Sequence, residues 1–273
     1  MSSVTALPID LLLLLLAIGG IGGFLSGMLG VGGGIIFVPA LYFTFTSSGI
    51  DPGAAMHVSV GTSLALVLAT GGSSAFWHHK KGSVDFSIIK SWAPAIILGV
   101  LAGTFLATHV NGHFLKQLFA IVTLLISFYM AFSREPQTEP ASHRLSKIVQ
   151  RAGAALIAMV SVLIGIGGAM LNIPFMTYLG VPMRKSVGTG GALGCIISFP
   201  ALIGYIYSGW QHMHELPPYS FGYVNLLAAA VIIPVSMILS PIGVHVSHKI
   251  SRNILRRIFS AVLILVSLRM FIA

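Results

Sequence analysis

The sequence predicts an all-α, polytopic membrane protein made of two inverted repeats. Three observations support this prediction: the composition, the charge-free blocks and a repeated glycine motif. Of the 273 residues, 56% are hydrophobic and only 8% are charged, and the mean hydropathy is +0.95. A soluble domain is about one quarter charged, so a chain with this few charges could not cover its surface in water. The composition therefore excludes an ordinary soluble enzyme and a disordered chain.

Charged residues divide the chain into neutral blocks, most of them long enough to cross a bilayer. Blocks without Asp, Glu, Lys or Arg cover residues 11–50, 52–79, 91–115, 117–133, 152–183, 186–214, 216–248 and 258–268. A membrane-spanning helix needs about 20 apolar residues, so a block of ordinary length predicts one helix. The blocks 11–50 and 152–183 are longer and rich in glycine. Each of these two predicts a pair of helical segments separated by a break.

Three ordered sequence matches divide the chain into two similar halves. The residues GVGGG at 30–34, followed by Pro39, recur 135 positions later as GIGGA, followed by Pro174. The residues SVGT at 59–62 recur at 186–189, and LKQLF at 115–119 recurs as LRRIF at 255–259. We therefore predict a first membrane repeat over residues 1–135, a cytoplasmic linker over 136–147 and a second repeat over 148–273. Each repeat has one broken or re-entrant glycine-rich segment and three further spans.

The basic residues predict how the two repeats are oriented. Membrane proteins collect Lys and Arg in their cytoplasmic loops. If each glycine-rich block enters and leaves the membrane on the same side, thirteen of the 15 basic residues share one side, and only Lys116 and Arg269 face the other. If each half instead had four simple spans, the basic residues would divide almost evenly. The first arrangement inverts one half relative to the other and places both termini on the extracytoplasmic side. This arrangement is consistent with a glycine-rich block that turns back inside the membrane and equally with one that crosses the membrane twice.

The two glycine motifs predict a binding site for a small anion. A break inside the membrane is tolerated only where protein or a wet cavity satisfies its backbone groups. The helix after the break exposes free N–H groups and a partial positive charge, which suit an anion. The candidate substrate-binding residues are the motif glycines, nearby hydroxyls and one amide: Gly32, Gly33, Gly34, Ser59, Thr62, Ser63, Gly167, Gly168, Asn172, Ser186 and Thr189.

Close helix packing is the competing explanation for the same residues, because glycines and small hydroxyl residues also let helices approach each other. Gly32, Gly33, Gly167 and Gly168 should adopt positive φ in either case, a conformation that glycine alone adopts without strain. His57 and its counterpart Arg184 could attract anions at opposite membrane faces, or could simply be interfacial side chains.

The remaining polar residues argue against other classes of function. All six acidic residues lie outside the predicted spans, so paired-carboxylate catalysis and a cation channel with acidic rings have no candidates. We therefore predict that the protein is not an enzyme. No complete metal-ligand set is visible, and neither a metal nor a cofactor is predicted. The net charge of +9 is explained by membrane orientation, so the expected partners are a lipid bilayer and a small anion, not nucleic acid. The residues do not indicate whether H⁺ or Na⁺ is coupled.

The paired GxGG(G/A)xxxxP motifs, the SVGT segment after each and the charged loop between the halves resemble the TauE/SafE family of sulfite exporters. The resemblance covers nearly the whole chain. It implies an inner-membrane carrier of small sulfur-containing anions, such as sulfite or organosulfonates like sulfoacetate. We therefore predict a secondary transporter that works by alternating access, with an anion-selective channel as the alternative. The chain departs from an ideal repeat at Ala169, which replaces Gly34, and at Gly190 and Gly191, which replace Ser63 and Leu64.

Overall fold

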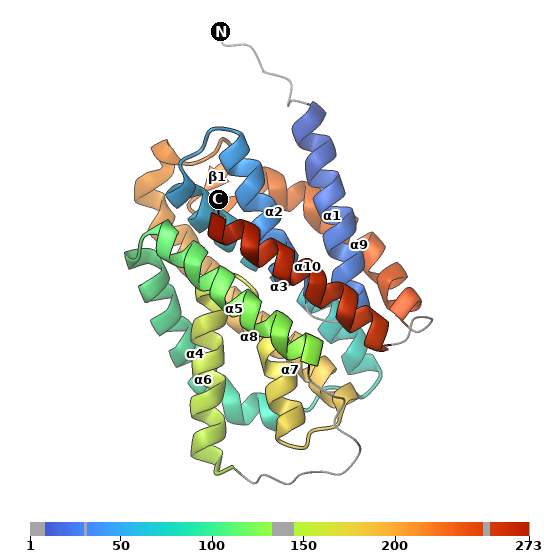
Figure 1. Cartoon of the computed structure of the whole chain (residues 1–273). Coiled ribbons are helices and arrows are strands. Elements are labelled where there is room, and N and C mark those ends of the chain that lie inside the picture. Colours follow the sequence, from blue (N-terminus) through green and yellow to red (C-terminus); the bar gives the residue numbers. More distant parts are fainter. Residues whose placement is uncertain (1–8, 30–31, 133–144, 248–251, 273) are drawn as a thin grey trace.

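The computed structural model describes residues 9–29, 32–132, 145–247 and 252–272, and these residues are almost entirely helical (Figure 1). The helices are α1 (Ile9–Leu29), α2 (Gly34–Ser47), α3 (Pro52–Lys80), α4 (Phe86–His109), α5 (Gly112–Phe132), α6 (Lys147–Ile164), α7 (Ala169–Tyr178), α8 (Met183–Gly209), α9 (Leu226–Ser247) and α10 (Arg252–Ile272). In this described part, 7 helices are long and apolar enough to cross a membrane. The predicted all-α, polytopic class is confirmed.

A short irregular connection between α8 and α9 was not predicted. It contains a 3₁₀ turn, η1 (Trp210–Glu215), and an antiparallel hairpin of β1 (Ser220–Phe221) and β2 (Val224–Asn225). Tyr223 lies at the hairpin turn, and its N–H donates to the carbonyl oxygen of Tyr205 in α8. The hairpin is therefore held against the helix bundle.

Both glycine-rich blocks are broken, as predicted. The first block forms α1 and α2, and the second forms α6 and α7. Helices α2 and α7 have 14 and 10 residues, fewer than the roughly 20 needed to cross a bilayer. We call residues 9–132, with α1–α5, the first half and residues 145–272, with α6–α10, the second half. The predicted linker 136–147 lies outside the described residues except for its last three positions, and both chain termini also lie outside them.

The long helices α3 and α8 form the centre of the bundle and run antiparallel. The most apolar window of α3 is 72% buried and that of α8 is 50% buried, whereas the other candidate spans are about one third buried or less. Cys195 of α8 lies against Leu68 of α3, and Gly188, nearer the start of α8, lies against His78 near the end of α3. The end of α3 therefore adjoins the beginning of α8.

Two pairs of outer helices, α1 with α9 and α4 with α6, run in parallel and each join the two halves. In α1 and α9, Gly19 faces Ile232 and Gly27 faces Ser240, so the two helices run in the same direction. Helices α4 and α6 pair in the same way (Figure 1). A Cβ at Gly27 would overlap the backbone of Ser240. These outer glycines therefore serve close helix packing.

Most of the described basic residues share one end of the bundle, drawn at the bottom of Figure 1. The end of α3 and the starts of α4, α6 and α8 meet there, as the helix directions require. The basic residues on these segments are Lys80, Lys81, Lys90, Lys147, Arg151, Arg184 and Lys185. We call this the basic end. Lys116 lies near the start of α5, at the opposite end.

Candidate functional site

The two breaks are formed by glycines with positive φ, as predicted. Gly32 and Gly33 have φ of 78° and 79°, and Gly167 and Gly168 have φ of 71° and 82°. Gly33 and Gly168 are the N-caps of α2 and α7, and neither helix start receives a side-chain cap. No capping side chain therefore accepts a hydrogen bond from the first N–H groups of α2 or α7.

The breaks lie against each other in the middle of the protein. A Cβ at Gly34 would lie 2.6 Å from the carbonyl oxygen of Gly165 and 2.8 Å from the Cα of Ile166. The hydroxyl of Ser63 donates to the same Gly165 oxygen over 2.8 Å. Val67, one turn further along α3, is the nearest neighbour of any Cβ placed at Gly32 or Gly167. The structure thus brings both predicted glycine motifs and Ser63 together around the centre of α3.

Three buried polar groups without a partner surround the start of α7. Asn172, Ser161 and Ser198 are each 0% exposed. The Oδ1 atom of Asn172 and both serine hydroxyls make no hydrogen bond to the described residues. The Asn172 amide nitrogen donates to the carbonyl oxygen of Gly168 over 3.0 Å. A buried polar group left unpaired costs about 1–3 kcal/mol, so these three groups need a hydrogen-bonding partner, either water or a ligand.

The three side chains lie beside two adjacent glycines. A Cβ at Gly168 would lie 3.2 Å from Asn172 Nδ2 and 3.4 Å from Ser161 Oγ, and a Cβ at Gly167 would lie 2.9 Å from Ser198 Oγ. We call Ser161, Asn172 and Ser198, together with Gly167 and Gly168, the α7 polar cluster. The nearest atoms are apolar, since a Cβ at Gly168 would overlap Ile197 Cδ1 and a Cβ at Gly167 would overlap Val67 Cγ1, so a side chain at either glycine would displace them. The cluster is closed to solvent in this structure.

The first break has no equivalent cluster. Phe37 stands where the second half has Asn172, and its ring lies 2.7 Å from the position of a Cβ at Gly33. Phe37 is 0% exposed and fills the corresponding space with carbon. The two breaks are therefore similar in backbone conformation but different in chemistry, and the polar side chains gather at the second one.

The predicted hydroxyls of the SVGT segments bond to backbone away from the breaks. Ser59 donates to Ala55 O over 2.6 Å, and Ser186 donates to Val181 O over 3.2 Å. The Thr62 hydroxyl accepts from the N–H of Asn225 over 2.9 Å. The Thr189 hydroxyl accepts from the N–H of Asp85, also over 2.9 Å. The two threonines therefore tie each central helix to the start of α9 or α4 in the other half.

His57, which was considered as an anion-attracting group, is packed between backbone carbonyls. Its Nδ1 lies 2.9 Å from Gly53 O and its Nε2 lies 3.0 Å from Ala107 O, and its ring stacks on Tyr223. Arg184 is exposed at the basic end.

Sequence reasoning missed Ser161 and Ser198. Ser161 lies one helical turn before Gly165, and Ser198 lies in the middle of α8. Single serines inside apolar helices are common and usually bond to the preceding turn. Two signals were available: Ser161 lies one turn ahead of the break, and it matches Ser26 at the same offset of 135 positions as the glycine motifs.

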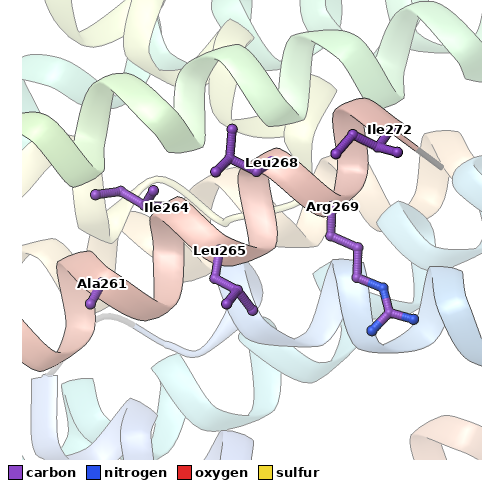
Figure 2. Close-up of a pocket in the computed structure, with 6 residues that line it drawn as sticks. All are labelled: Ala261, Ile264, Leu265, Leu268, Arg269 and Ile272. Carbon is purple, nitrogen blue, oxygen red and sulfur yellow. The ribbon is translucent and has the colours of Figure 1, made fainter.

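An apolar surface groove along α10 has a different character from the α7 polar cluster. It has a volume of about 680 Å³ and lies along α10, where Figure 2 shows Ala261, Ile264, Leu265, Leu268, Arg269 and Ile272. Except for Arg269 its walls are apolar, and Leu265 and Ile272 are 67% and 87% exposed. Such a surface suits contact with lipid chains and lacks the converging polar groups that a small hydrophilic substrate needs.

The long apolar helices and the central pair of glycine breaks define a multi-pass membrane transport protein, and comparison with known proteins names its family. The profile of the family described as "Sulfite exporter TauE/SafE" matches residues 15–270, and the chain belongs to this family. No solved structure matches the chain.

Three relatives, each described as a probable membrane transporter protein, cover almost the whole chain. The relative from Haemophilus influenzae is 30% identical, with 96% of this chain and 98% of the relative aligned. The relative from Methanocaldococcus jannaschii is 28% identical, with 93% and 92% aligned. The relative from Bacillus subtilis is 24% identical, with 93% and 94% aligned. The similarity therefore extends over both halves and both glycine motifs.

Proposed function

We propose that this protein is a secondary transporter of a small anion, a sulfur oxyanion or an organosulfonate, and that the α7 polar cluster binds the substrate. The observation that carries the proposal is the convergence of three unpaired, fully buried polar groups on an uncapped helix start. Helix starts favour anions through their free N–H groups and partial positive charge. The serine hydroxyls can donate to the oxygens of an anion as well.

Because the two breaks differ in chemistry, we assign fewer of the predicted residues to direct contact with substrate. The glycines of the first motif and Ser63 support the backbone of the second break, since Ser63 bonds to Gly165 and Gly34 contacts Ile166. Gly167, Gly168 and Asn172 are the predicted residues that we place in contact with substrate, joined by Ser161 and Ser198. Thr62 and Thr189 act on the site through the segments that they join, whereas Ser59 and Ser186 bond to the backbone just before them in the chain.

Alternating access is supported by the directions of the helices. The SVGT segments make α3 and α8 equivalent in the two halves, and these helices run antiparallel. Repeats of opposite direction that meet at broken helices are a known transporter architecture. We therefore propose that residues 1–135 and 148–273 are inverted repeats that rock about the central breaks.

The basic end gives the proposed orientation. Seven described basic residues gather there, which makes it the cytoplasmic side of a cell inner membrane by the preference of Lys and Arg for that side. Helix α1 begins at the opposite end (Figure 1). We accordingly propose that both chain termini are extracytoplasmic and that the linker is cytoplasmic.

The test is transport of radiolabelled sulfite and sulfoacetate into proteoliposomes by the parent protein and by Asn172→Leu. We expect the parent to show saturable uptake that is accelerated by unlabelled substrate on the opposite side, as a carrier requires. Asn172→Leu should lose uptake while unfolding at the same or a higher temperature, because it removes a buried unpaired acceptor.

Leu171→Met is the matched control, since it changes an adjacent apolar side chain and should leave uptake unchanged. Parent-like uptake by Asn172→Leu would exclude the α7 polar cluster as the substrate site. Uptake that does not saturate, together with single-channel currents in planar bilayers, would favour the anion-selective channel instead.

A further inference from the structure

A polar pocket lies at the end of the bundle opposite the basic end. It has a volume of about 250 Å³ and is bounded by Tyr42 of α2, residues 51–53 at the start of α3, and residues 111–113 and Lys116 at the start of α5. The pocket is separate from the α7 polar cluster, with which it shares no residue. Because a water molecule occupies about 30 Å³, the pocket can hold a small hydrated ion.

Lys116 is the only basic residue, besides His113, that lines this pocket, and its side chain is 6% exposed. Among the described residues no carboxylate pairs with its ammonium group, and its recorded contact is with the ring of Tyr42, at 5.9 Å from the ring centroid. That distance is at the limit of a cation–π interaction. A buried charge is strongly unfavourable unless it is paired, so the ammonium group requires an anionic or aqueous partner in the pocket.

Two helix starts adjoin the pocket around Lys116. A Cβ at Gly112 would overlap the backbone of Gly53, so the first turns of α3 and α5 are in direct contact. The start of α5 points the positive end of its dipole at the pocket, whereas the carboxylate of Asp51 offsets the positive end of α3. Asn111 caps the second of them through Oδ1, which accepts from the N–H of Phe114 over 2.8 Å.

The one carboxylate in the wall is engaged by its own helix. Asp51 Oδ2 accepts from the N–H groups of Gly53 and Ala54 over 2.8 and 3.1 Å. This capping arrangement directs the negative charge at the start of α3. His113 accepts at Nε2 from the side-chain amide of Gln117 over 2.9 Å, which leaves its ring proton on Nδ1 as a further donor at the pocket wall.

From these contacts we infer that the pocket at Lys116 is a second anion site, which binds a small free oxyanion such as sulfite, sulfate or phosphate. The ammonium group of the largely buried Lys116 supplies the charge, and the start of α5 adds positive potential. The site does not depend on the proposed transport function. A phospholipid headgroup carries the same phosphate chemistry, so the experiment must separate a free oxyanion from a lipid.

The test is calorimetric titration of the purified protein with sulfate in detergent, for the parent and for Lys116→Met. Methionine keeps most of the length and apolar contact of the lysine stem and removes its charge. Loss of a charged hydrogen-bonding partner should weaken sulfate binding about tenfold to a hundredfold. Lys116→Arg should restore most of the binding, and Lys90→Met, which removes an exposed charge at the basic end, should leave it unchanged.

The α7 polar cluster provides an independent control. Asn172→Leu should retain the Lys116-dependent binding, so failure of the transport proposal would leave this site intact. Sulfate binding by folded Lys116→Met equal to that of the parent, or an equal loss in Lys90→Met, would overturn the inference. Repeating the titration in nanodiscs separates the two sources of anion. Unchanged affinity supports a free oxyanion, whereas loss of binding in nanodiscs that contain anionic lipid assigns the pocket to a headgroup and contradicts the inference.

Discussion

The hydroxyl of Ser63 donates a 2.8 Å hydrogen bond to the carbonyl oxygen of Gly165, which lies 102 residues away in the sequence. Gly165 ends α6 with a φ of 71°, where the chain leaves the helix. Its carbonyl therefore has no helical N–H to accept from, and a serine of the first half supplies the missing donor. The second break is thus stabilised by the first half of the protein.

Replacing Ser63 with alanine should destabilise the protein by about 1–3 kcal/mol, the cost of leaving a buried carbonyl unpaired. Ser59→Ala is the matched control. Ser59 is also 0% exposed and lies in the same helix, but it bonds to the Ala55 carbonyl one turn earlier, within regular helix. The free energy of unfolding, measured by denaturant titration in detergent, should fall clearly only for Ser63→Ala. Equal effects of the two changes would contradict this reading of the break.

Gly168→Ala should combine backbone strain with a steric clash. At φ of 82° a Cβ costs about 1–2 kcal/mol, and at Gly168 it would also displace the side chain of Ile197. Gly180 has a φ of 85° with nothing within 4 Å of its Cβ position, so Gly180→Ala isolates the backbone cost.

The two alanine variants can be compared by unfolding and by transport per folded molecule. We expect Gly180→Ala to transport at the parental rate and Gly168→Ala to transport poorly even where it is folded. If both variants were less stable but transported at the parental rate per folded molecule, close helix packing would be enough to explain the glycine at position 168.

Removing the threonine hydroxyls should weaken the joint between the halves unequally. Thr62 and Asn225 are both buried, so Thr62→Val leaves the N–H of Asn225 without this partner or water. The corresponding bond of Thr189 goes to the partly exposed Asp85, whose N–H water can reach. The free energy of unfolding should therefore fall by about 1–3 kcal/mol for Thr62→Val and by less for Thr189→Val. A larger fall in the free energy of unfolding for Thr189→Val than for Thr62→Val would show that the solvent exposure of the N–H donor does not determine the cost of losing the bond.

Asp85 should make stability depend on pH in the acid range. The hydroxyl of Ser87 lowers the pKa of the Asp85 carboxyl group, and the N–H groups of Ile88 and Ser87 and the charge of Lys185 lower it further, whereas burial opposes them. A carboxyl group with a lowered pKa in the folded state contributes stability above its unfolded pKa of about 3.9 and loses that contribution as the pH falls through the folded value. Ser87→Ala should therefore reduce the loss of stability between about pH 4 and pH 2. Identical acid unfolding curves for parent and variant would contradict this.

The sequence by itself was sufficient for the membrane class, the two breaks and the positive φ of their glycines. These features are local. Too few charges are present to cover a soluble surface, and the runs at 30–34 and 165–169 cannot continue an ordinary helix without cost. The recurrence of GxGG(G/A)xxxxP and SVGT then indicated two similar halves before any contact was known.

Only the tertiary structure decided which polar groups meet and which remain unpaired. Thr62 reaches Asn225 from 163 residues away, and Ser161 and Ser198 from different helices face the same glycines. The central helices α3 and α8 have almost no amphipathic pattern, so no polar face in the sequence marks the direction in which Thr62 or Ser198 points. Asn172 and Phe37 occupy matching positions in the two halves of the sequence. Both are fully buried, but only Asn172 has an unpaired polar atom, which burial makes costly. The surrounding packing therefore makes Asn172 a candidate binding residue and leaves Phe37 as an apolar core residue.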